Sequence, residues 1–381
     1  MDDRDALVKE LIRLARDAEE PQVLLADSLR DQATAAFDSL EEALAAALME
    51  SAAPRGRRPQ KSEVERRLTE AFEHPLYVAT ADGKYFSLDG PVLETGPSPY
   101  TVDDDDEVDP ITAVHYVGDS DDVVLFTTTG RYFGLDRRMI PTWDRRDQPR
   151  TIRDILFLEA QESVCAILPR RKVAVGRVIH VTREGKGKAS DASEFGSGLD
   201  RSGLDAFLVR DGDLPIAVLG GPTENTLFCA SRQGQGIHFD ADDMRSMGRK
   251  AVGVNVMKLQ GDDDAVVSAF LGRHVRQVAV ITELGFGKRL DFSEFRTQGR
   301  GGQGMQVIRL NPGDGVAGVC PCNPAEDLGV TTDQGRVFRI PATDLNLMGR
   351  PARGDQVIEL RAQERILHLS ALPCGSAPEA S

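Results

Sequence analysis

The amino-acid sequence predicts a mainly β protein, a six-bladed β-propeller with an α-helical N-terminal extension. A glycine with Thr or Ser three residues before it recurs six times, and a β-rich run of residues lies on either side of each copy. These turn glycines are Gly83, Gly130, Gly185, Gly234, Gly285 and Gly335. They are separated by 47, 55, 49, 51 and 50 residues, close to the ~40 to 50 residues of a four-stranded propeller blade. The helical pattern lies before the first copy, over residues 5–50.

The region before the propeller divides into a helical extension, residues 1–50, and a basic linker with a short helix, residues 51–73. In the extension, Leu7 and Leu11 recur on one helical face, and Pro21 separates two helices. A helical pair of this length encloses little core by itself, so it either packs on the propeller or forms a homodimer with a second copy. The linker is either a solvated tether or a contact for DNA phosphates.

The propeller is expected over residues 74–373, with a disordered tail over residues 374–381. The first blade contains an acidic run, residues 103–109, that lacks the spaced oxygens and central glycine of an EF-hand loop. We interpret this run as a solvated loop, and the alternative is a DNA-mimicking segment that occupies a basic surface when DNA is absent. The second blade contains an arginine-rich loop around the single tryptophan, Trp143, which is a candidate clamp for a nucleic-acid backbone.

The charge of the chain is unevenly distributed. The formal net charge of −15 is unusual for a protein that binds nucleic acid. Residues 171–310, however, carry 20 Lys and Arg against 17 Asp and Glu, whereas residues 73–170 carry 9 against 19. Because salt screens charges beyond about 10 Å, a locally positive surface on an acidic protein can still attract phosphates. Blades three to five are therefore the candidate DNA-binding region.

Glycine also lies two residues after the turn glycine in blades three, four and five, at Gly187, Gly236 and Gly287. Without a Cβ, the backbone there can approach another surface closely, so these glycines either bring amides to phosphates or accommodate a bulge in the hairpin. Basic residues gather near the same turns and in the glycine-rich loop of blade five, residues 298–304. The candidate DNA-binding residues are Arg183, Lys186, Lys188, Arg245, Arg249, Lys250, Lys288, Arg289, Arg296, Gln298 and Arg300.

Residues 276–310 read RQVAVITELGFGKRLDFSEFRTQGRGGQGMQVIRL. This stretch resembles the C-terminal domain of DNA gyrase A and of its relatives in topoisomerase IV, and the blades before and after it are similar. The resemblance covers roughly residues 74–373 and implies a six-bladed β-pinwheel that binds double-stranded DNA around its rim. The family's box, Gln-Arg-Arg-Gly-Gly-Lys-Gly, reads Gln-Gly-Arg-Gly-Gly-Gln-Gly over residues 298–304 here, so it keeps one of three basic residues and lies in blade five.

The sequence gives no sign of an enzyme. About 73 residues precede the blades, too few for a DNA-cleavage domain, and Tyr132, in the single Arg-Tyr pair, is expected in the core. Six scattered histidines and five cysteines without CxxC spacing predict no catalytic triad, metal site or disulfide framework. Cys320 and Cys322 are expected to pack in a strand, with metal or redox chemistry as the alternative. No cofactor, signal segment or membrane span is expected, so we expect a cytoplasmic, nucleoid-associated protein.

We therefore expect a non-catalytic protein that binds and bends or wraps double-stranded DNA largely independently of sequence. Its role would be accessory to DNA topology or nucleoid organisation, by itself or beside DNA gyrase or topoisomerase IV. The alternative is a protein-interaction propeller that has lost DNA wrapping and binds a topoisomerase or another partner.

Overall fold

The computed structural model describes residues 76–80, 83–88, 111–117, 122–141, 151–195, 202–222, 225–324 and 326–372. The expected helical extension, linker, acidic run, tryptophan loop and C-terminal tail lie outside these residues. The chain divides into two compact units, Met1–Pro59 and Gln60–Ser381, and the fold described here is that of the second unit.

The described residues form six antiparallel sheets, each built on a hairpin around one turn glycine. The hairpins are β1 (Leu76–Thr80) with β2 (Tyr85–Leu88), β5 (Asp122–Thr127) with β6 (Arg131–Asp136), β8 (Arg177–Thr182) with β9 (Lys186–Asp191), β12 (Thr226–Ser231) with β13 (Gln235–Asp240), β16 (Gln277–Thr282) with β17 (Phe286–Asp291), and β20 (Asp327–Thr332) with β21 (Val337–Pro341).

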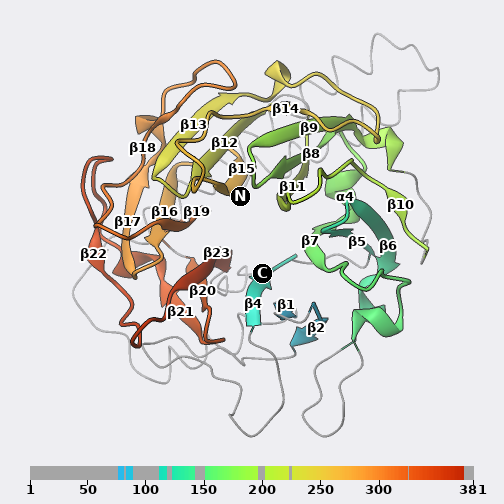
Figure 1. Cartoon of the computed structure of the whole chain (residues 1–381), viewed down its shortest axis with the longest axis horizontal. Helices are drawn as coiled ribbons and strands as arrows, with labels where there is room; N and C mark the ends of the chain where they lie inside the picture. The colour runs from blue at the N-terminus through green and yellow to red at the C-terminus, as the bar shows by residue number, and fades with distance from the viewer. Residues whose placement is uncertain are drawn as a thin grey trace, which may run out of the picture. The chain divides into compact units, whose positions relative to one another are not determined.

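A third strand pairs with the first strand of each hairpin and lies on the inner side of a ring of sheets (Figure 1). These inner strands are β4 (Ile111–His115), β7 (Val164–Pro169), β11 (Pro215–Gly221), β15 (Val266–Leu271), β19 (Val316–Cys322) and β23 (Ile366–Leu372). The first and last sheets also meet, because Thr331 Oγ1 donates to the carbonyl of Thr112 at 2.7 Å. The prediction of a mainly β, propeller-like fold with its blades in a ring is confirmed.

The four middle sheets gain a short outer strand from the next repeat along the chain. For example, β18 follows β17 of the fifth sheet but pairs with β13 of the fourth sheet, where Gln306 lies opposite Gln235. The outer strands are β10 (Leu204–Asp205), β14 (Val254–Asn255), β18 (Met305–Gln306) and β22 (Asp355–Gln356). A repeat in the sequence is therefore not a blade in space, which the sequence interpretation did not anticipate.

Short helices lie between the strands of the described residues: five 3-10 helices each follow the second strand of a hairpin, one precedes β7, and one α-helix lies between β7 and β8. They are α4 (Arg170–Val173) and the 3-10 helices η1 (Arg137–Met139), η2 (Ile152–Asp154), η3 (Ala192–Glu194), η4 (Ala241–Asp243), η5 (Phe292–Glu294) and η6 (Ala342–Asp344). None of the helices in the described part of the chain has the length and apolar content needed to span a bilayer.

The turns that define the repeat have a common geometry. Each turn glycine has a φ between 74° and 86° and donates its N–H to the carbonyl of the Thr or Ser three residues earlier, at 2.9 to 3.0 Å. A side chain at that φ would be strained, which explains the recurrence of glycine. The threonine hydroxyl adds a second bond; Thr182 Oγ1, for example, accepts the N–H of Lys186 at 3.3 Å.

A buried or partly buried carboxylate stabilises five of these turns, and the sequence interpretation missed it. Asp213, Asp264 and Asp314 each accept the N–H of the residue before the turn glycine, at 3.0 to 3.1 Å. Glu162 and Glu364 instead accept threonine hydroxyls of their turns. The carboxylates recur at intervals of 51, 51, 50 and 50 residues, so the spacing itself could have identified them.

The hydrophobic core lies between neighbouring sheets. Phe126 of the second sheet, for example, packs with Val178 of the third, and Phe228 of the fourth packs with Leu290 of the fifth. Each sheet is thus stabilised by apolar contacts with the sheets on either side. The segments that lead to the outer strands lie at the outer edges of the sheets and carry many of the charged residues.

Candidate nucleic-acid interface

Three segments, which we call crossovers, connect the fourth, fifth and sixth hairpins to their outer strands on the preceding sheets. They are residues 244–253, 295–304 and 345–354. Each contains a Gly-Arg pair whose arginine lies five residues before the outer strand, at Gly248-Arg249, Gly299-Arg300 and Gly349-Arg350. The glycine-rich loop of residues 298–304, which the sequence singled out, is therefore part of the second of three equivalent crossovers. This second crossover covers the fourth sheet. The other two crossovers cover the third and fifth sheets.

The close backbone approach expected at Gly187, Gly236 and Gly287 is made within the protein. A Cβ at Gly236 would lie 2.6 Å from Val307 Cγ2, and one at Gly287 would lie 2.8 Å from Val357 Cγ2, in each case just after the outer strand. At Gly187 the corresponding contact is with Val256. These distances are shorter than any real Cβ contact. The three glycines therefore make room for the exchanged strand, and the expectation that they bring amides to phosphates is corrected.

Lys188 and Lys288 are buried, with exposures of 1% and 0%. Lys288 Nζ donates to the carbonyls of Gly349, Arg350 and Ala352 at 2.8, 2.8 and 2.9 Å. Burial lowers the pKa of each ammonium to about 8. Neither side chain can reach a phosphate without leaving these bonds, so we exclude both from the proposed DNA contacts.

Arg289, Arg300 and Gln298 are partly buried and hold the crossovers in place. Arg289 Nε donates to the Leu345 carbonyl at 2.8 Å, and Arg300 donates to the carbonyls of Asp243 and Asn255 at 3.2 and 2.6 Å. The Gln298 N–H donates to the His238 carbonyl at 2.7 Å. Each arginine has five N–H donors and uses only some of them here, so a phosphate contact remains compatible with this anchoring.

The other candidates are more accessible. Arg183, Arg245, Lys250 and Arg296 are exposed, and Lys186 and Arg249 are half-exposed. Lys186 Nζ donates to Asn255 Oδ1 at 2.5 Å. Arg183 lies away from the crossovers, at a turn whose neighbouring cavity of about 540 Å³ is lined by Asp262, Asp263 and Asp264 among others. That acidic setting opposes phosphate binding at Arg183.

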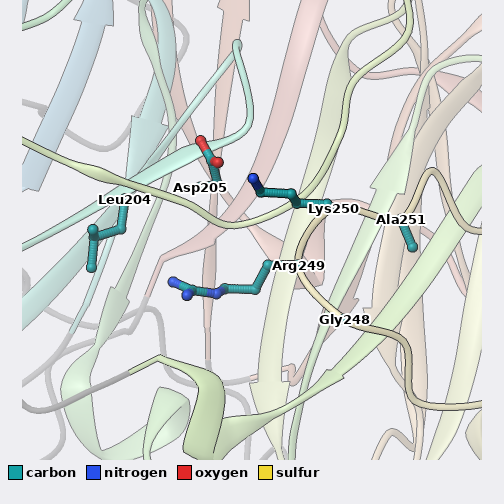
Figure 2. Close-up of a pocket in the computed structure, with 6 residues that line it drawn as sticks. All are labelled: Leu204, Asp205, Gly248, Arg249, Lys250 and Ala251. Carbon is teal, nitrogen blue, oxygen red and sulfur yellow. The ribbon is translucent and has the colours of Figure 1, made fainter.

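A cavity of about 520 Å³ lies between the first crossover and β10. Figure 2 shows Arg249 and Lys250 extending from the crossover towards β10, which contributes Leu204 and Asp205. Two basic side chains therefore gather at one open recess on the outer edge of the sheets. Asp205 is the acidic member of its lining.

The structure adds basic residues that the sequence interpretation did not select. Arg353 is exposed and Arg350 is half-exposed in the third crossover, while Lys258 and Arg309 are exposed just after β14 and β18. The main-chain N–H of Lys258 donates to the Gly302 carbonyl at 2.8 Å, so it lies beside the next crossover. The Gly-Arg spacings of 51 and 50 residues could have revealed Arg350. We define the basic rim as Arg245, Arg249, Lys250, Lys258, Arg296, Arg300, Arg309, Arg350 and Arg353.

Side chains considered for other chemistry lie in the core. Tyr132 is 4% exposed and packs against Phe195, as expected. Cys320 and Cys322 are buried, and burial raises the pKa of the Cys322 thiol to about 12. Within the described ranges, no three His, Cys, Asp or Glu side chains come together in a way that could hold a metal ion.

Three segments of the chain match the family described as DNA gyrase C-terminal domain, beta-propeller: residues 225–272, 276–323 and 328–373. These three repeats are similar to the repeats of the DNA gyrase C-terminal domain family. Each matched segment begins near the first strand of a hairpin and ends near the inner strand, so it contains one complete crossover.

The chain is also similar to curated DNA gyrase A proteins. It is 32% identical to DNA gyrase A of Kosmotoga olearia over 65% of this chain and 31% of the relative. For DNA gyrase A of Klebsiella oxytoca the identity is 32%, over 65% of this chain and 28% of the relative. For that of Chlamydia trachomatis it is 30%, over 69% and 32%. The chain thus spans about a third of the length of these relatives.

Solved structures share the fold. The DNA gyrase A C-terminal domain superposes with a TM-score of 0.66 at 20% identity, covering 78% of this chain and 99% of that domain. The C-terminal domain of DNA topoisomerase IV gives a TM-score of 0.62 at 19% identity, covering 79% and 93%. At these identities the similarity concerns the fold alone.

Proposed function

We propose that this chain binds double-stranded DNA along the basic rim and bends or wraps it without reading the base sequence. It acts as a non-catalytic accessory of DNA topology or nucleoid organisation in the cytoplasm, either alone or beside DNA gyrase or topoisomerase IV. In this proposal the ring has six blades, supported by the six sheets among the described residues, and residues 1–50 form a helical extension that can pair two copies.

The repeated crossover is the observation that supports DNA binding most strongly. Three successive sheets carry an outer segment with Gly-Arg at the same place, and the six other residues of the basic rim lie within the same three repeats. A regular series of cations at the edge of neighbouring sheets suits the regular series of phosphates on a duplex. Contacts of this kind position a duplex and carry no direct sequence information.

The proposal is tested by measuring the affinity of purified protein for a fluorescent linear duplex. Fluorescence anisotropy gives this affinity at about 50 and 200 mM salt. Wild-type affinity is expected to fall steeply with salt. The triple variant Arg245→Ala, Arg249→Ala and Lys250→Ala should bind more weakly and reduce the slope of log K against log salt by about 2 to 3, since each phosphate contact contributes about 0.9.

Arg183→Ala is the matched control, because Arg183 is also exposed but lies at the acidic turn cavity. It should leave both affinity and slope close to wild type. If folded wild-type protein does not bind at about 50 mM salt, or if the triple variant keeps the wild-type slope, the rim is not a DNA-binding surface.

A second candidate function, a protein-interaction propeller, is favoured by two exposed apolar residues at positions that correspond to members of the basic rim. Five exposed residues follow one another along the chain at spacings of 51, 50, 51 and 50 residues: Phe157, Leu208, Lys258, Arg309 and Glu359. Lys258 and Arg309 belong to the basic rim. Phe157 and Leu208 are 74% and 52% exposed. A pull-down with gyrase that depends on Phe157 and Leu208, together with absent DNA binding, would support this function instead.

A further inference from the structure

The buried lysines occupy the same position in two hairpins, three residues after the turn glycine. Lys188 Nζ donates to the Gly248 carbonyl at 3.0 Å, and Lys288 Nζ donates to the Gly349 carbonyl at 2.8 Å. In each case the acceptor is the glycine of the Gly-Arg pair in the crossover. The ammonium therefore contacts the peptide that carries the rim arginine.

The other end of the same peptide is also bound. The N–H of Arg249 donates to Glu194 Oε2, and the N–H of Arg350 donates to Glu294 Oε2, both at 3.1 Å. The Gly-Arg peptide thus has its carbonyl on an ammonium and its N–H on a carboxylate. Both bonds are charge-assisted, which makes them stronger than ordinary peptide hydrogen bonds. We call this arrangement the peptide clamp.

The second crossover has no such clamp, because Ile237 occupies the position of the lysine. There Arg300 itself bonds to the carbonyls of Asp243 and Asn255. The crossovers are thus anchored in two ways. Where a lysine holds the peptide, the Arg350 side chain makes longer contacts: it donates to the Gln306 carbonyl at 3.5 Å and lies 3.8 Å from Glu294. Where the lysine is absent, Arg300 donates to the corresponding carbonyl, that of Asn255, at 2.6 Å.

Lys188 also connects two segments that come from different repeats. Its second bond, at 2.9 Å, is to the carbonyl of Ala206, the residue after β10. Gly248 and β10 both line the cavity in Figure 2. The buried ammonium consequently sets the separation of the two walls from which Arg249 and Asp205 project.

We propose that Lys188 with Glu194, and Lys288 with Glu294, are positioning residues that fix the Gly-Arg peptide and hold Arg249 and Arg350 ready to receive a DNA phosphate. This inference rests on the proposed function. Burying a charged group is unfavourable unless it is fully hydrogen-bonded, and the three carbonyls around Lys288 Nζ meet that condition. Because the clamp orders the backbone of the arginine before the ligand arrives, less entropy is lost on binding.

The test is a double-mutant cycle on DNA affinity with Lys288→Met, Arg350→Ala and the pair. Each single variant is expected to weaken binding roughly 3-fold to 10-fold and to lower the salt slope by about 1. The pair should bind no more weakly than Arg350→Ala alone, because Lys288 acts through Arg350. The control pair, Lys288→Met with Arg300→Ala, should be additive. Additive effects of Lys288→Met and Arg350→Ala would overturn the clamp.

A second variant tests the clamp without removing a buried lysine, and a second measurement tests it without DNA. Glu294→Ala removes the carboxylate, which is 34% exposed and so less critical to the core, and should give the same non-additivity with Arg350→Ala. Hydrogen exchange of the crossover amides in Lys288→Met should rise at Gly349, Arg350 and Ala352, while the exchange of β16 is unchanged. Unchanged exchange at the crossover overturns the clamp. Absent binding by wild-type protein overturns the proposed function instead.

Discussion

At the residue scale, neighbouring cations of one strand have different roles. Lys288 and Arg289 are adjacent in β17, yet Lys288 is fully buried under a crossover and Arg289 is half-exposed. Successive side chains of a strand point to opposite faces, and the exchanged segment covers the face of Lys288. Since lysine is rarely buried, sequence patterns offered no reason to separate the two.

The turn carboxylates provide a residue-scale prediction. Asp264 is 7% exposed and accepts the N–H groups of Gln233, Gln260 and Ala265 at 3.0, 2.8 and 3.0 Å. Asp264→Ala should lower the free energy of unfolding by about 2 to 4 kcal/mol, because several amides lose a charged acceptor. Urea denaturation followed by circular dichroism measures it. Asp262→Ala, an exposed neighbour in the same loop, should change stability by under about 0.5 kcal/mol.

At the element scale, the crossover is the unit that links one sheet to the next and presents the basic rim. In the second crossover, residues 295–304, two glycines have different roles. Gly304 has a φ of 80°, and a Cβ there would lie 2.5 Å from the Gly236 carbonyl oxygen, whereas a Cβ at Gly299 would meet open space. Glycine is required at position 304 because two backbones pack closely there, whereas position 299 tolerates a side chain.

A matched pair of variants in this loop tests that distinction. Gly304→Ala should lower the free energy of unfolding by about 2 to 4 kcal/mol, since left-handed geometry alone costs an L-residue roughly 1 to 2 kcal/mol and the clash adds to it. Gly299→Ala should be neutral within about 0.5 kcal/mol. Thermal denaturation of both proteins measures the difference. Equal melting temperatures for the two variants would show that β18 does not pack on β13 as described.

At the scale of the whole propeller unit, charge changes along the rim. Equivalent exposed positions carry Phe157, Leu208, Lys258, Arg309 and Glu359 in chain order. The basic part is therefore an arc bounded by apolar positions on one side and an acidic position on the other. An arc on a curved ring favours a duplex that curves with it.

DNA bending is the corresponding prediction. A duplex of about 40 base pairs is short relative to the DNA persistence length of about 150 base pairs, so its ends stay apart unless a protein bends it. Energy transfer between dyes on the two ends should rise on binding of wild-type protein. The triple variant of Arg309, Arg350 and Arg353 to Ala should bind with a smaller rise, because the arc is shortened. Binding without any change in energy transfer would mean that the duplex is held straight.

Most of the architecture could be predicted from the sequence. The six turn glycines, with Thr or Ser three residues earlier, predicted the hairpins and the propeller-like ring, and Tyr132 was correctly placed in the core. The candidate site was predicted less well. Lys188 and Lys288 turned out to be buried, Gly187, Gly236 and Gly287 face an exchanged strand, and Arg350 and Arg353 were missed because the third crossover lies in a segment of net negative charge.

The sequence by itself determined the repeat, because turn geometry depends on a few adjacent residues whose spacing can be read directly. Only the tertiary structure decided which sheet receives each outer strand. Residues 305–306 have the same local sequence whether they pair with their own hairpin or with the hairpin one repeat earlier, so local patterns cannot distinguish the two. That pairing determines which glycines must lack a side chain, which lysines are buried and which arginines form the rim, since all three depend on contacts between residues far apart in the chain.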